Sequence, residues 1–87
     1  MELAKEIKKS FRKIEGFIPP EKLEKFKNTS PKYLEKYNYG LGTMIRLKLL
    51  RPKSVLYRAF IENGFTDKDE MTIEIITSFH KNISSVY

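Results

Sequence analysis

The sequence contains no cysteine and no tryptophan, and it has a single histidine among its 87 residues. The absence of cysteine excludes a disulfide scaffold, a thiolate nucleophile and a cysteine-based zinc site. One histidine, His80, excludes a multi-histidine metal site and acid–base catalysis by a histidine pair. No apolar run exceeds three residues, whereas a membrane-spanning helix needs about 20. The charged segment Met1–Ser10 also lacks the apolar stretch of a signal peptide.

From these absences we expect no metal, no cofactor and no membrane span, in a soluble protein of the cytoplasm. A length of 87 residues permits one domain with one modest core. Seventeen lysines and arginines against eleven acids give a formal net charge of +6. The charges are unevenly distributed, because residues 41–60 contain basic side chains and no acid, whereas residues 61–87 are rich in acids.

The N-terminal part of the chain shows the pattern of three helices. Apolar residues recur every three or four positions over Leu3–Ile18, which is the period of a single helical stripe, and Pro19-Pro20 then ends the helix. A short helix is predicted over residues 21–27. Ser30-Pro31 indicates the start of a third helix, with serine as N-cap and proline at the first helical position, and this helix stops near Asn38.

The run Thr43–Leu50 has apolar residues on almost every side of a helix, which is typical of a buried element. Alternation over Ile45–Leu49 also fits a short strand. Beyond Pro52, Ser54 is expected to cap a helix whose apolar residues are Val55, Leu56, Ala59, Phe60 and Ile61.

That helix is predicted to end at Gly64, in the left-handed conformation, with Phe65 folding back as the accompanying apolar contact. Thr66 and Asp69 have the spacing of a capping box, so Thr66 is the expected N-cap of the last helix. The inner face of that helix is predicted to be Met71, Ile75, Ile76, Phe79 and Ile83.

The two last helices have the outline of a helix-turn-helix, in which the start of the second helix enters the major groove. Here that start is Asp67-Lys68-Asp69-Glu70, whose three acids phosphates would repel. Binding to a nucleic-acid backbone through the first helix and the Arg46–Arg58 patch remains an alternative. Pairing of this patch with the acidic last helix explains the charges equally well. The patch consists of Arg46, Lys48, Arg51, Lys53 and Arg58.

Gly40, Gly42 and Arg46 form a weak anion-binding candidate, since bare amides at a helix start and a forked guanidinium both suit phosphate. Neither a P-loop nor a dinucleotide fingerprint accompanies them. We favour the structural interpretation, in which the glycines allow a turn and a close helix approach and Arg46 pairs with Asp69 or Glu70.

Tyrosines gather beside these glycines, and tyrosine is enriched at protein-binding hot spots. A core with hydrogen-bonded hydroxyl groups would explain the same cluster. The predicted partner-binding residues are Tyr33, Tyr37, Tyr39, Arg46, Lys48 and Arg51.

Three motifs follow one another: Tyr39-Gly40-Leu41-Gly42 with Ile45-Arg46, then Asp69-Glu70-Met71-Thr72, then Phe79-His80-Lys81. Together they resemble an uncharacterised family of small bacterial and phage domains. Its pattern is aromatic-Gly-Leu-Gly, two residues and Ile-Arg, followed by Asp-Asp/Glu-Met-Ser/Thr and aromatic-His-Lys/Arg. The resemblance covers residues 33–83 approximately and departs after Arg46, where the family continues with two asparagines and a tryptophan.

The family has no assigned activity, and the resemblance singles out one basic, one acidic and one imidazole group. We therefore expect Arg46, Asp69 and His80 to meet in a buried polar network. In a catalytic role His80 would have no cysteine or second histidine to work with, so a boundary histidine with a hydrogen bond is favoured.

The sequence thus predicts an all-α fold, a compact bundle of five or six short helices in a single domain over residues 1–87. Residues 1–38 supply the N-terminal helices and residues 41–84 the C-terminal unit with the family-like motifs. The expected function is that of a small intracellular protein-binding module, an adaptor or an inhibitor, and not of an enzyme. Nucleic-acid backbone binding and sensing of a small anion or nucleotide are the alternatives.

Overall fold

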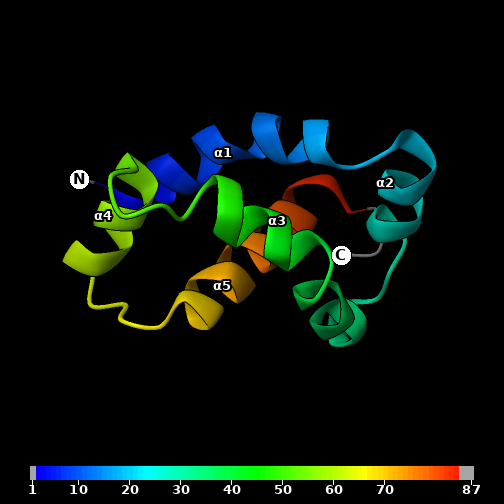
Figure 1. The fold of residues 1–87 in the computed structure, drawn as a ribbon. Coiled ribbons are helices and arrows are strands. Elements are labelled where there is room, and N and C mark those ends of the chain that lie inside the picture. The colour runs from blue at the N-terminus through cyan, green and yellow to red at the C-terminus, as the bar shows by residue number, and fades with distance from the viewer. Residues whose placement is uncertain (1, 85–87) are drawn as a thin grey trace.

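The computed structural model describes residues 2–84, and helices are the only regular elements in that part of the chain (Figure 1). The all-α prediction is confirmed. Ile45–Leu49 is helical up to Lys48, so the strand alternative is wrong. The elements are α1 Leu3–Phe17, α2 Pro20–Lys27, the 3-10 helix η1 Pro31–Asn38, α3 Leu41–Lys48, α4 Val55–Glu62 and α5 Lys68–Ile83.

Helix α1 runs along one side of the molecule (Figure 1). It packs against α3, α4 and α5. Ile7 and Ile14 of the stripe are buried, while Leu3, Phe11 and Ile18 lie half-buried against the core. The apolar stripe of the first helix therefore completes the core, as its period predicts. The lysines of α1 occupy the outer surface.

Helix α5 is the central element of the bundle. Met71, Ile75, Ile76 and Phe79 on its inner face are all buried, as predicted, and Ile83 is half-buried at its end. It packs against α1, α2, η1 and α3. Because these contacts join residues 1–38 to residues 41–84, the two parts of the chain share one core.

Local signals at the ends of α4 behave as predicted. The Ser54 hydroxyl accepts a hydrogen bond from the Tyr57 amide at 3.0 Å and so caps the helix. Gly64 adopts a positive φ of 90°, a conformation that costs glycine little. The Phe65 amide donates to the Phe60 carbonyl at 3.0 Å. Their rings pack edge to face, with centroids 4.9 Å apart, which completes the Schellman motif.

Two other end signals differ from expectation. Asp67, and not Thr66, caps α5, because its carboxylate accepts the Asp69 amide at 2.8 Å. Aspartate caps at least as well as threonine, and the helix begins one residue later than the capping-box spacing suggests. Ser30 occupies the N-cap position of η1 without a side-chain capping bond. The Tyr33 amide donates to the Ser30 carbonyl at 2.9 Å instead, the i to i+3 pattern of a 3-10 turn.

Candidate functional site

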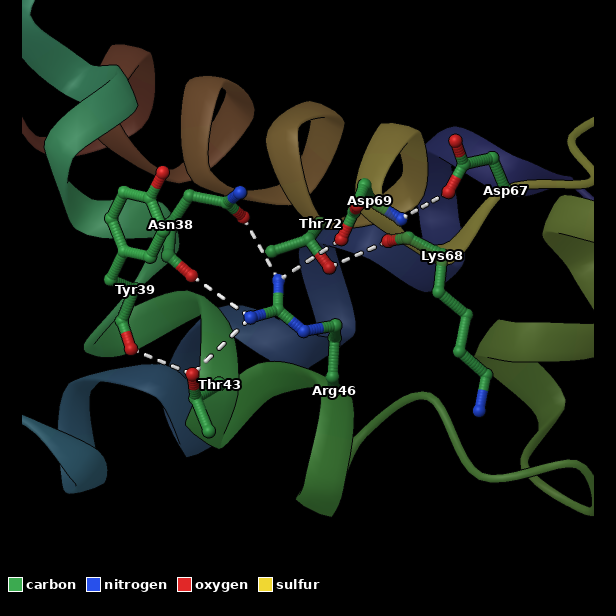
Figure 2. Close-up of polar contacts among 8 residues, drawn as sticks. All are labelled: Asn38, Tyr39, Thr43, Arg46, Asp67, Lys68, Asp69 and Thr72. Atoms are coloured by element: carbon green, nitrogen blue, oxygen red, sulfur yellow. Dashed lines mark hydrogen bonds and ion pairs between the residues drawn. The ribbon is translucent and has the colours of Figure 1, made fainter.

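Arg46 on α3 is held in a ring of acceptors at the junction of η1, α3 and α5 (Figure 2). Its Nη1 donates to Asn38 Oδ1 at 2.9 Å, and its Nη2 donates to the Asn38 carbonyl at 3.0 Å. Nη2 also donates to Thr43 Oγ1 at 3.2 Å, and Thr43 Oγ1 donates to the Tyr39 carbonyl at 2.6 Å. We call Asn38, Thr43, Arg46 and Asp69 the arginine clamp.

Asp69 closes the clamp from α5, with Oδ1 3.6 Å from Arg46 Nη1. The predicted pairing of Arg46 with an acid of the last helix is therefore confirmed. The Asp69 side chain is 66% exposed and the Arg46 side chain 25% exposed, so water screens the pair and it contributes little to stability. The two bonds to Asn38 are better shielded, and they fix the end of η1 against α3.

Gly42 is buried beneath the guanidinium, in the first turn of α3. A Cβ atom added there would lie 2.9 Å from Asn38 Oδ1, 3.0 Å from Thr72 Cγ2 and 3.2 Å from Arg46 Nη1. Thr72 is itself fully buried, and its hydroxyl donates to the Lys68 carbonyl at 2.7 Å. Glycine at position 42 is thus the residue that lets α3 and α5 approach each other at the clamp.

This geometry disfavours an anion site built on Gly40, Gly42 and Arg46. The guanidinium is directed at Asn38 and Asp69, and Gly42 faces Thr72 and not solvent. Gly40 alone of the three is exposed. The structural interpretation of the two glycines therefore fits the observed contacts.

His80 does not join Arg46 and Asp69, so the predicted three-residue network is wrong. Asp69 and His80 are eleven positions apart on α5, which separates them by about 16 Å along the helix axis. His80 is fully buried, and its Nε2 lies 2.7 Å from the Thr29 carbonyl. Its ring packs edge to face on Phe26, with centroids 5.2 Å apart. The histidine fastens the α2–η1 turn to α5.

The tyrosines near the clamp divide into two classes. Tyr37 is half-buried: its hydroxyl lies 3.1 Å from Thr29 Oγ1, and its ring meets Phe26 edge to face at 4.8 Å. Tyr33 and Tyr39 are 57% and 83% exposed. In Figure 2 the Tyr39 ring lies away from the guanidinium of Arg46. Tyr37 therefore lies at the edge of the core, whereas the rings of Tyr33 and Tyr39 are exposed.

An apolar groove lies beside Tyr37, between the α1–α2 turn, η1 and the start of α3. Its volume is about 310 Å³, within the range of small ligand pockets. The sequence patterns did not reveal it, because its walls come from four separate segments. We call it the aromatic groove; it is lined by Phe17, Ile18, Pro19, Lys22, Phe26, Tyr37, Gly40, Leu41 and Met44.

The family model of DUF6794, a domain of unknown function, matches residues 4–83 of the chain. The chain belongs to the DUF6794 family. This confirms the expected membership of an uncharacterised family, while the motif pattern and the bacterial or phage origin stay predictions. No curated protein and no solved structure matches the chain.

In this DUF6794 chain the Arg46–Arg58 patch does not form one surface. Arg46 turns into the clamp, and Arg51 donates its Nε proton to the Leu47 carbonyl at 3.1 Å. Lys48 lies on the other side of α3, with its ammonium 5.8 Å from the centre of the Phe17 ring. Successive positions of an α-helix are about 100° apart around its axis, so residues 46 and 48 are separated by about 200° and point in nearly opposite directions.

A different basic surface arises where α1 meets the α3–α4 connection. A hollow of about 440 Å³ there is lined by Lys9, Lys13, Lys48 and Lys53. Glu6 lies in the same hollow and pairs with Lys9 at 3.3 Å. We call this surface the lysine hollow.

Within residues 2–84 no group of three or more histidine, aspartate or glutamate side chains is placed to hold a metal ion. None of the helices in the same range is both long enough and apolar enough to cross a bilayer.

Proposed function

We propose that this DUF6794 chain is a small protein-binding module, an adaptor or an inhibitor without catalytic activity of its own. The observation that carries the proposal is the aromatic groove, with Tyr39 exposed at the corner between η1 and α3. Phe17, Leu41 and Met44 line the groove and are only half-buried, so they offer apolar area that a partner side chain can cover.

The polar groups that the motifs single out support a role without catalysis. Arg46 is engaged by Asn38, Thr43 and Asp69, and His80 is buried against the Thr29 carbonyl. A reacting group needs access to a substrate and a neighbour that activates it, and these side chains are engaged in internal contacts. We also propose a cytoplasmic location, which suits a chain without cysteine.

The test is capture of a partner from native lysate by the tagged protein, with and without nuclease. Met44→Glu places a carboxylate in the apolar groove while keeping a side chain of similar length and helix propensity. Leu47→Glu is the matched control, because Leu47 lies on the same helix, is 64% exposed and does not line the groove. We expect one nuclease-resistant partner that Leu47→Glu retains and Met44→Glu loses, followed by direct binding of the purified pair. Retention by both variants would refute docking in the groove.

A second candidate function is binding to a nucleic-acid backbone through the lysine hollow. The observation in its favour is that α1 contributes Lys9 and Lys13 next to Lys48 and Lys53. This candidate predicts an electrophoretic shift of double-stranded DNA whose affinity falls steeply with salt, because phosphate contacts release counterions. The double variant Lys48→Glu/Lys53→Glu should abolish the shift, whereas no shift of the wild-type protein at low salt would exclude the candidate.

A further inference from the structure

We infer that the occupant of the aromatic groove is a short segment of a partner protein that combines large apolar side chains with aspartate or glutamate. This inference rests on the proposed function and specifies the chemistry of its partner. Two observations support it: the composition of the groove walls and the sign of the charges around them.

The walls select apolar side chains. Eight of the nine lining residues are uncharged, and Phe17, Ile18, Leu41 and Met44 contribute half-buried apolar surface. Phe26 and Tyr37 brace one side, edge to face, with centroids 4.8 Å apart. A volume of about 310 Å³ admits one or two large side chains and not a folded domain surface. An anchoring leucine, phenylalanine or methionine of the partner would fill it.

The charges beside the groove favour a partner segment with acidic residues. Lys22 and Tyr37 also line an adjoining hollow of about 360 Å³, together with Lys25 and Lys36. None of the described residues that line either hollow is acidic. No ion pair joins Lys22, Lys25 or Lys36 to a carboxylate within residues 2–84. We call these three lysines the lysine rim.

Lys36 connects the rim to the groove, because its ammonium lies 5.4 Å from the centre of the Tyr37 ring. A carboxylate of the partner next to the anchored apolar side chain would therefore lie close to the positive charges of the lysine rim. Such complementarity speeds association and fixes the orientation of a flexible segment. A basic segment with the same apolar anchor would be repelled, so the rim supplies specificity that the groove alone lacks.

The first experiment is selection of a displayed library of random 12-residue peptides on the purified wild-type protein. We expect enriched peptides to contain large apolar residues flanked by Asp or Glu, and to bind Leu47→Glu but not Met44→Glu. Peptides that bind Leu47→Glu but not Met44→Glu, and that contain no acidic residue, would overturn this inference and leave the protein-binding function intact. Absence of any groove-dependent peptide would overturn the inference as well, while partner capture from lysate tests the function separately.

The second experiment reverses the charge of the lysine rim, and Lys22 is the only residue of the groove walls that it changes. The triple variant Lys22→Glu, Lys25→Glu and Lys36→Glu changes only exposed side chains, so the fold should persist. The control triple Lys5→Glu, Lys8→Glu and Lys13→Glu makes the same change of net charge on the exposed face of α1. We expect the rim variant to weaken binding of the selected acidic peptide about tenfold or more, because three attractive charge contacts become repulsive. Equal effects of both triples would mean that net charge alone is responsible and would refute the rim.

A second copy of the chain is the competing occupant. Sedimentation of the wild-type protein over a range of concentrations should give a monomer. A concentration-dependent dimer that Met44→Glu abolishes would assign the groove to self-association and overturn the peptide assignment.

Discussion

Arg46 donates to Asn38 twice, at the side-chain oxygen and at the main-chain carbonyl, and so ties the last residue of η1 to the last turn of α3. A guanidinium suits this task because its donors are held in a rigid, planar fork. The main-chain carbonyl is an acceptor that no side-chain change at position 38 removes. The clamp thereby fixes the corner at which the chain turns from η1 into α3, next to the aromatic groove.

Replacing the arginine tests the clamp. Arg46→Lys keeps the charge and loses the fork, and we expect it to lower the free energy of unfolding by about 1–2 kcal/mol, because the half-buried acceptors of Asn38 lose a donor. Urea unfolding of Arg46→Lys, Asn38→Ala and the double variant measures the coupling. Additive effects of the two single changes would contradict a direct contribution of the pair. Asp69→Asn is the control and should cost less, since the ion pair at 3.6 Å is exposed.

Gly42 and Gly16 provide opposite predictions for the same substitution. Helix propensity alone favours alanine over glycine, by about 1 kcal/mol in a helix interior and by less in the terminal turns where Gly16 and Gly42 lie. Gly16→Ala should show this gain, because a Cβ atom there meets nothing within 4 Å. Gly42→Ala should destabilise the protein by about 1–2 kcal/mol net, since its Cβ would lie 2.9 Å from Asn38 Oδ1 and overpacking costs more than propensity returns. Thermal unfolding of both variants measures the two effects. An equal gain in stability at both positions would contradict a close approach of α3 and α5 at Gly42.

The elements that the sequence predicted correctly are those set by local rules. The spacing of Ile7 and Ile14, the Ser54 cap and the turn at Gly64 each depend on a few neighbouring residues, and each is found in the structure. Pairing of Arg46 with Asp69 or Glu70 was also predicted, and Asp69 is the acid that the structure places beside it. Local periodicity and charge thus fix the helices and one contact between them.

The sequence did not reveal the contacts that depend on how the helices pack against one another. Asn38 is an uncharged residue at the end of an element, and nothing in its neighbourhood marks it as the main partner of Arg46. The acceptor of His80 is the carbonyl of Thr29, a backbone atom that carries no sequence signal. The lysine hollow combines Lys9 with Lys48 across the core, so a count of charges along the chain cannot find it.

The half-buried Tyr37 and the exposed Tyr39 should differ in how much their substitution lowers stability. Tyr37→Phe loses the contact of its hydroxyl with Thr29 Oγ1 and should cost about 0.5–1.5 kcal/mol. Tyr37→Ala should cost about 2–3 kcal/mol, below the range for a fully buried ring, because the half-buried ring loses its packing on Phe26. Tyr39→Ala is the control and should stay within about 0.5 kcal/mol of the wild type, since the ring is 83% exposed. Urea unfolding measures all three, and a Tyr39→Ala loss as large as that of Tyr37→Ala would contradict the division.

Inorganic phosphate tests the anion-sensor alternative. Because the Arg46 guanidinium is engaged by Asn38, Thr43 and Asp69, we expect millimolar phosphate to leave the melting temperature unchanged beyond the effect of sodium chloride at equal ionic strength. Differential scanning fluorimetry makes the comparison, with Arg46→Lys as the second sample. A rise with phosphate that disappears in Arg46→Lys would show that the clamp opens to bind an anion and would restore that function.

His80 allows the contribution of one long-range hydrogen bond to be measured. A carbonyl oxygen only accepts, so the contact of Nε2 with the Thr29 carbonyl at 2.7 Å requires the proton on Nε2. His80→Phe keeps an aromatic ring next to Phe26 but removes the donor, and we expect the free energy of unfolding to fall by about 1–3 kcal/mol. His80→Gln is the complementary variant, because its amide nitrogen can donate from a similar distance along the side chain while the ring packing is lost. If His80→Phe unfolds at the same urea concentration as the wild type, the hydrogen bond to the Thr29 carbonyl contributes nothing to the stability of that junction, and this expectation is wrong.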